Sequence, residues 1–105
     1  MNVDATFFET GVGAGAAVLR NSKGEAVAGG YWMFENIPDA TTAEALALNN
    51  GLQRLLDIAC SPVIVESDNL ELINVCNGDI EMWSPYSTIL YDCIHLADQI
   101  GGITF

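Results

Sequence analysis

The hydrophobic period of the chain changes at Thr41, and this change restricts the fold more than any other feature. The segment TTAEALALNNGLQRLLDIA, residues 41–59, carries apolar residues at helical spacing, whereas the segments before it resemble strands. The predicted buried stripe of this helix consists of Leu48, Leu52, Leu55, Leu56 and Ala59. A capping box, Thr41-x-x-Glu44, marks the predicted start, and Pro62 follows the predicted end.

Three strands are predicted before this helix. Residues 3–8 mix β-branched and aromatic side chains, which is typical of a strand. Residues 14–34 predict two more strands around a turn at residues 21–24, Asn-Ser-Lys-Gly. Short connections between the three strands indicate an antiparallel meander. The glycines at positions 11, 13 and 15 lack the spacing of a nucleotide-binding loop and predict a bend entering the second strand.

Four further elements are predicted after the helix. Residues 63–66 form an apolar strand whose Val and Ile residues predict burial on both faces and parallel pairing. A short helix starts at Asp68 or Asn69 and stops near Gly78. A longer helix has Ser84 as N-cap and Pro85 at its first position, and it closes at Gly101 or Gly102. Its predicted buried stripe consists of Ile89, Cys93, Leu96, Ala97 and Ile100. Residues 103–105 begin a last strand, so the predicted order is βββαβααβ within one α/β domain, residues 1–105.

The charge of the chain is nearly all negative. It has 14 Asp and Glu residues against 3 Lys and Arg, a formal net charge of -11, while half of its residues are apolar. Such an apolar fraction excludes a disordered acidic tail, and the negative surface disfavours broad electrostatic binding of nucleic acid without metal ions. We find no secretory signal and no membrane-spanning stretch, so we expect an intracellular protein.

The cysteines and the histidine do not form a predicted zinc site. Cys60, Cys76 and Cys93 lack CxxC spacing and are predicted to be reduced thiols that act as small core residues. His95 is predicted to lie on the exposed side of its helix, opposite the buried stripe.

Three acids occupy positions that packing alone does not explain. Glu44 lies four residues before Leu48 on the helix stripe, so its carboxylate should face the sheet. Asp68 follows the predicted parallel strand, at the end where ligands gather, and Asp4 lies inside the first strand, where Asp is disfavoured. Helix capping is an alternative role for Glu44 and Asp68. If the three converge, oxygen-only ligands suit Mg²⁺ or Mn²⁺, and paired metals of this kind support phosphodiester hydrolysis.

Four segments in order resemble the plant ribonuclease H-like domains, which are related to the ribonuclease H modules of retroelement reverse transcriptases. The segments are VDATF, GVGAGAAVLRNSKGEAVAGG, TAEALALNNGLQ and VIVESDNLELI. The resemblance implies a mixed five-stranded sheet with helices packed on it. It also implies that Asp4, Glu44 and Asp68 hold magnesium, or manganese, ions that cleave the RNA strand of an RNA–DNA hybrid.

The family places a fourth carboxylate, and often a histidine, beyond the fifth strand. Because the sequence ends at Phe105, and Asp92 and Asp98 precede the last strand, we expect a truncated domain without the closing helix and with weak or no cleavage. Hybrid binding is disfavoured by the net charge, since the only cations are Arg20, Lys23 and Arg54. The alternatives are a non-catalytic module that binds a protein partner at the open C-terminal edge of the sheet, or a fragment of a longer active nuclease.

Overall fold

The computed structural model describes residues 1–78 and 86–105. The observed elements are β1 (Asn2–Phe7), β2 (Gly13–Arg20), β3 (Ala26–Phe34), α1 (Ala40–Asp57), β4 (Val63–Ile64), α2 (Leu70–Cys76), α3 (Ser87–Ile100) and β5 (Ile103–Thr104). The predicted order βββαβααβ is confirmed. No helix in the described ranges is long and apolar enough to cross a membrane.

The five strands form one mixed sheet in two parts. β1, β2 and β3 pair as an antiparallel meander, and β4 pairs with β5 in parallel. A parallel bridge between Asn2 and Glu66 joins the two parts. Two backbone hydrogen bonds support it, from Val3 N to Glu66 O (3.0 Å) and from Glu66 N to Met1 O (2.8 Å). The strands therefore follow the order β3-β2-β1-β4-β5, with β1 beside β4.

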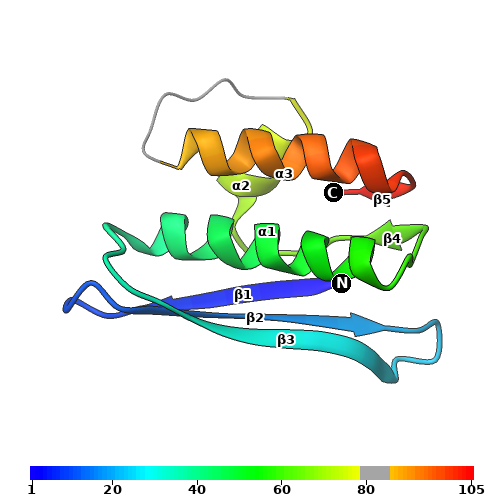
Figure 1. The fold of residues 1–105 in the computed structure, drawn as a ribbon, viewed down its shortest axis with the longest axis horizontal. Helices are drawn as coiled ribbons and strands as arrows, with labels where there is room; N and C mark the ends of the chain where they lie inside the picture. Colours follow the sequence, from blue (N-terminus) through cyan, green and yellow to red (C-terminus); the bar gives the residue numbers. More distant parts are fainter. Residues whose placement is uncertain (79–85) are drawn as a thin grey trace.

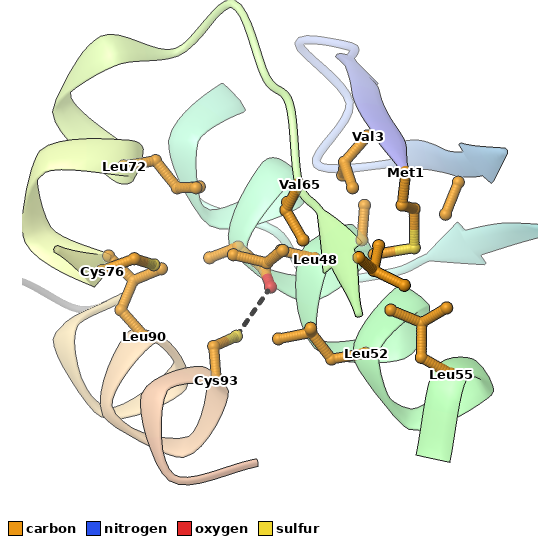
Figure 2. Packing of buried hydrophobic residues seen from close by; sticks show 14 of the residues in the cluster. Met1, Val3, Leu48, Leu52, Leu55, Val65, Leu72, Cys76, Leu90 and Cys93 are labelled. Carbon is orange, nitrogen blue, oxygen red and sulfur yellow. Dashed lines mark hydrogen bonds between the residues drawn. The ribbon is translucent and has the colours of Figure 1, made fainter. Parts of the chain in front are cut away.

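Helix α1 lies between the β1–β3 sheet and α3 (Figure 1). Small side chains bring the helix close to the sheet: a Cβ atom added at Gly15 would lie 2.6 Å from the Cβ atom of Ala47. Figure 2 shows the core that this arrangement encloses, in which Leu48 and Leu52 of α1 and Leu90 and Cys93 of α3 are fully buried. The sheet face away from α1 carries no other element of the described chain (Figure 1).

The predicted capping box at Thr41 is wrong. Helix α1 begins at Ala40, and its N-cap is Asp39, whose carboxylate accepts a hydrogen bond from Thr42 N at 2.7 Å. Asp is a strong N-cap because its oxygen satisfies an amide that the helix leaves without a partner. At the other end, Ala59 lies outside the helix with a φ of 52° and is exposed, while Leu56 is only partly buried. The other three leucines of the predicted stripe are buried.

The prediction that the strand at residues 63–66 is buried on both faces is also wrong. Val63 and Val65 are buried, but Ile64 is 63% exposed and Glu66 is exposed. The helices cover only one face of the sheet in the described chain, so alternate residues of this strand face solvent. The strand is parallel to β5, as predicted.

Helix α3 carries its buried stripe slightly shifted from the predicted one. The predicted cap Ser84 and the following Pro85 lie outside the described residues, and the described helix begins at Ser87. Leu90 is fully buried together with Cys93, and Gly101 ends the helix with a φ of 76°. Ala97 is buried as predicted, whereas the three other predicted positions are partly buried: Ile89, Leu96 and Ile100.

The cysteines are free thiols and contribute to the core. Cys76 and Cys93 are buried, Cys60 is half-buried, and the Cys93 Sγ lies 3.8 Å from the carbonyl oxygen of Ala45 (Figure 2). Burial raises the pKa of the Cys76 thiol to about 11 and that of Cys93 to about 12. His95 is exposed on α3, as predicted.

Candidate metal centre

Three carboxylates from separate elements meet at one point of the structure. Asp4 lies in β1, Glu44 in the second turn of α1, and Asp68 between β4 and α2. One oxygen of each lies within 4.8 Å of the oxygens from the other two. Within residues 1–78 and 86–105, this is the one group of three or more His, Cys, Asp or Glu side chains that could share a metal ion. The sequence analysis predicted the same three residues.

The adjacency of β1 and β4 places the two aspartates. Asp4 pairs with Ala16 of β2 in the antiparallel register, and its side chain is exposed. The bridge from Asn2 to Glu66 holds the chain that leads to Asp68 beside β1. Asp68 therefore leaves the carboxyl end of its strand next to Asp4, as parallel topology requires.

Asp68 does not cap the helix that follows it. The N-cap of α2 is Asn69, whose side-chain oxygen accepts a hydrogen bond from Leu72 N at 3.1 Å. The backbone N–H of Asn69 donates in turn to Ser67 Oγ at 3.1 Å. The alternative capping role for Asp68 is therefore excluded, and its carboxylate is available to a ligand.

Glu44 is the half-buried member of the group, whereas Asp4 and Asp68 are exposed. Its Oε2 atom is buried and has no hydrogen-bond partner among the described residues. The pKa of Glu44 is raised from its ordinary value, mainly because burial desolvates the carboxylate, and Asp68 and Asp4 add repulsion. A hydrogen bond from the Asn69 side chain acts in the opposite direction. Since Asp39 caps α1, capping does not explain Glu44 either.

The donor set fits a hard divalent cation. All three candidate ligands are carboxylates, and one of their oxygens is buried with no partner in the described part of the chain, which is costly for a charged group unless a cation compensates it. Oxygen-only sites suit Mg²⁺ or Mn²⁺ rather than zinc. Asp4, Glu44 and Asp68 are the residues that would hold the ion.

The sheet order β3-β2-β1-β4-β5, with three carboxylates where β1 meets β4, defines a ribonuclease H-like domain. The chain belongs to the Reverse transcriptase-like family, whose sequence profile matches residues 2–105. No curated protein sequence matches the chain significantly.

Solved ribonuclease H structures share this fold. Ribonuclease H1 from the halophilic archaeon Halobacterium salinarum superimposes with a TM-score of 0.89 at 18% identity, over 98% of this chain and 79% of that chain. The N-terminal ribonuclease H domain of a Mycobacterium tuberculosis protein gives 0.88 at 17% identity, over 98% and 76%. LC11 ribonuclease H1, solved in complex with an RNA/DNA hybrid, gives 0.86 at 16% identity, over 99% and 80%.

Sequence reasoning missed the exposed apolar surface beside the three carboxylates. The outward side chains of Tyr31 and Met33 in β3 lie in a hollow that Asp4 and Phe8 also line. The signal was present in the sequence, because the β3 segment AVAGGYWMF has no polar residues at either its odd or its even positions, which face opposite sides of the sheet.

Proposed function

We propose that this domain binds Mg²⁺ or Mn²⁺ through Asp4, Glu44 and Asp68 and hydrolyses the RNA strand of an RNA–DNA hybrid. The observation that carries the proposal is the convergence of three carboxylates within 4.8 Å, together with a buried Glu44 oxygen that has no hydrogen-bond partner among the described residues. The printed description of LC11 ribonuclease H1 with an RNA/DNA hybrid supports this choice of substrate, because that protein has the same fold.

The three carboxylates differ in exposure, and we assign their roles in metal binding accordingly. When bound, divalent metal ions activate a water and stabilise the leaving oxygen of a phosphodiester. The half-buried Glu44 anchors the inner side of the centre, and the exposed Asp4 and Asp68 leave its outer side open to a phosphate.

Hybrid binding depends on the cation because the chain itself has few positive groups. The net charge is -11, and no Lys or Arg lines the two hollows that include Asp4. Each phosphate contact made by a basic side chain contributes to salt-dependent affinity, so a chain with few such contacts binds weakly unless metal ions replace them. We expect hybrid binding to require Mg²⁺ or Mn²⁺.

The test is cleavage of an end-labelled RNA–DNA hybrid in Mg²⁺ and, separately, in Mn²⁺. Metal-dependent cutting should be lost in Asp68→Asn and kept in Asp98→Asn, a matched change of an exposed Asp on α3. Metal binding, measured by calorimetry on the same proteins, should follow the same pattern. Equal cutting by the wild type and Asp68→Asn would reject the assignment, as would a wild type that binds no divalent cation.

A second candidate function is a non-catalytic module that binds a protein partner at an open sheet edge. The expected C-terminal edge strand, β5, is only two residues long, whereas β3 at the opposite edge has nine residues without a charged side chain. Long uncharged edges favour strand addition by another chain. Tight metal binding without cleavage, together with capture of an extended peptide at β3, would favour this function.

Two further proposals concern the domain organisation of the chain and its location in the cell. We propose that residues 1–105 form a single domain, since one hydrophobic cluster includes residues from β1 through α3. We propose an intracellular location, because the three cysteines are free thiols, as is common in reducing compartments. Secretion into an oxidising medium with retention of all three thiols would argue against that location.

A further inference from the structure

A shallow groove extends from the metal centre over the open face of the sheet. Its volume is about 380 Å³, and Asp4 is one of its lining residues. Three large apolar side chains also line it: Phe8 is 51% exposed, Tyr31 69% and Met33 59%. The remaining lining residues are small, so the groove is open and broad enough for a flat group.

Tyr31 and Met33 lie side by side on the outer face of β3. They are two residues apart in the strand, and the Tyr31 hydroxyl donates a hydrogen bond to Met33 Sδ at 3.3 Å. This contact restrains the ring of Tyr31 while most of its surface stays accessible. Exposed rings so close to a polar site are unusual in a protein surface and mark an interaction site when they cluster.

We infer that this groove holds nucleotides of the strand that is cleaved, with a ribose packed against the Tyr31 ring. The inference rests on the proposed function. Because Asp4 belongs both to the carboxylate group and to the groove, a strand with one phosphate at the metal centre has neighbouring nucleotides over the groove. No Lys or Arg is among the described residues that line the groove, so contact here is made with sugars rather than with phosphates.

The charge of the chain favours this mode of recognition. With a net charge of -11, the protein gains little from counterion release, which dominates most nucleic-acid binding. Burial of apolar surface between the riboses and the side chains of the groove is an alternative source of affinity, and it tolerates any sequence because the sugar does not depend on the base.

The experiment is a fluorescence anisotropy titration of a labelled RNA–DNA hybrid with three variants. Ca²⁺ replaces Mg²⁺ to limit turnover, and a gel verifies that the strand is intact after each titration. Tyr31→Ala removes the ring, Tyr31→Phe keeps it, and Tyr91→Ala is the matched control, since Tyr91 is an exposed tyrosine of α3 on the other side of α1. Circular dichroism verifies folding, which an exposed side chain should not disturb.

Tyr31→Ala should weaken binding about tenfold, while Tyr31→Phe and Tyr91→Ala bind as the wild type does. The wild-type affinity should fall by only about fourfold for each phosphate contact when salt rises fourfold, and few such contacts are expected. Wild-type affinity in Tyr31→Ala would overturn the inference, while the cleavage assay with Asp68→Asn would still decide the proposed function. Sedimentation that shows a dimer dispersed by Tyr31→Ala would also overturn it, because a second copy would then occupy the groove.

Discussion

Replacing Glu44 with Gln should stabilise the metal-free protein and abolish its stabilisation by Mg²⁺. The substitution keeps the size of the side chain and one of its acceptor oxygens. It removes the negative charge that faces Asp4 and Asp68 across at most 4.8 Å. Most substitutions of a half-buried residue destabilise a protein, so a gain in stability is a specific signature of a repulsive carboxylate group.

The size of the effect follows from Coulomb's law. At 4.8 Å, two carboxylates repel by about 0.9 kcal/mol at the dielectric constant of water. Asp4 and Asp68 are exposed, so this lower limit applies, and salt at physiological strength roughly halves it. Glu44 takes part in two such pairs, which gives a predicted gain of about 1 kcal/mol. For a domain of about 100 residues, this corresponds to a Tm rise of about 4–8 °C.

The pH dependence of this gain has a definite sign. The pKa of Glu44 is raised above its ordinary value of 4.5, so the folded chain binds this proton more tightly than the unfolded chain. The stability contributed by the protonated group is therefore fully present below about pH 4.5 and is lost as pH rises through the folded pKa. The difference in Tm between Glu44→Gln and the wild type should be small at acidic pH and grow toward neutral pH.

Thermal unfolding by circular dichroism, first in EDTA and then in excess MgCl₂, measures both effects. Glu35→Gln is the matched control, because Glu35 is an exposed glutamate after β3 and its loss changes the net charge by the same amount. The reasoning is refuted if Glu44→Gln lowers the Tm in EDTA, or if Glu35→Gln raises it equally. Stabilisation of the wild type and Glu44→Gln by Mg²⁺ to the same extent would remove Glu44 from the metal centre.

Two further predictions concern the helix start and the thiols. Asp39→Ala should destabilise the fold by about 1 kcal/mol in urea denaturation, because α1 loses its N-cap hydrogen bond. Thr41→Ala should change stability much less. Equal losses of stability in the two variants would support the capping box at Thr41 instead. In the native state, iodoacetamide should modify the half-buried Cys60 well before Cys93, whose burial raises its pKa to about 12; equal labelling by mass spectrometry would contradict the packing in Figure 2.

The order of helices and strands was predictable because each segment has its own characteristic spacing of apolar residues. The strands before residue 41 and the helix after it differ in the spacing of apolar residues, and the turn at residues 21–24 has residue types that favour a reversal. The observed strands and helices follow that order. The pairing of β1 with β4 carries no such local signal, since it joins Asn2 to Glu66 across most of the chain.

Burial was harder to predict than element type. A run of Val and Ile at residues 63–66 has the composition of a strand covered on both faces, yet Ile64 is 63% exposed. The composition of a strand indicates whether its faces tolerate burial, whereas the exposure of its side chains depends on which face of the sheet the helices cover. In the described chain the helices pack on one face, so the apolar residues on the other face, including Ile64, Tyr31 and Met33, are exposed.

The roles of Glu44 and Asp68 could not be separated from capping by spacing alone. Each lies close to a helix start, and each fits a capping pattern that is frequent in proteins. The structure separates the roles because a neighbour takes each cap: Asp39 for α1 and Asn69 for α2. Once these neighbours satisfy the free amides, local structure gives no reason for a carboxylate at either position. Their shared proximity to Asp4 then becomes the property that needs an explanation, and the proposed binding of a divalent cation would supply it.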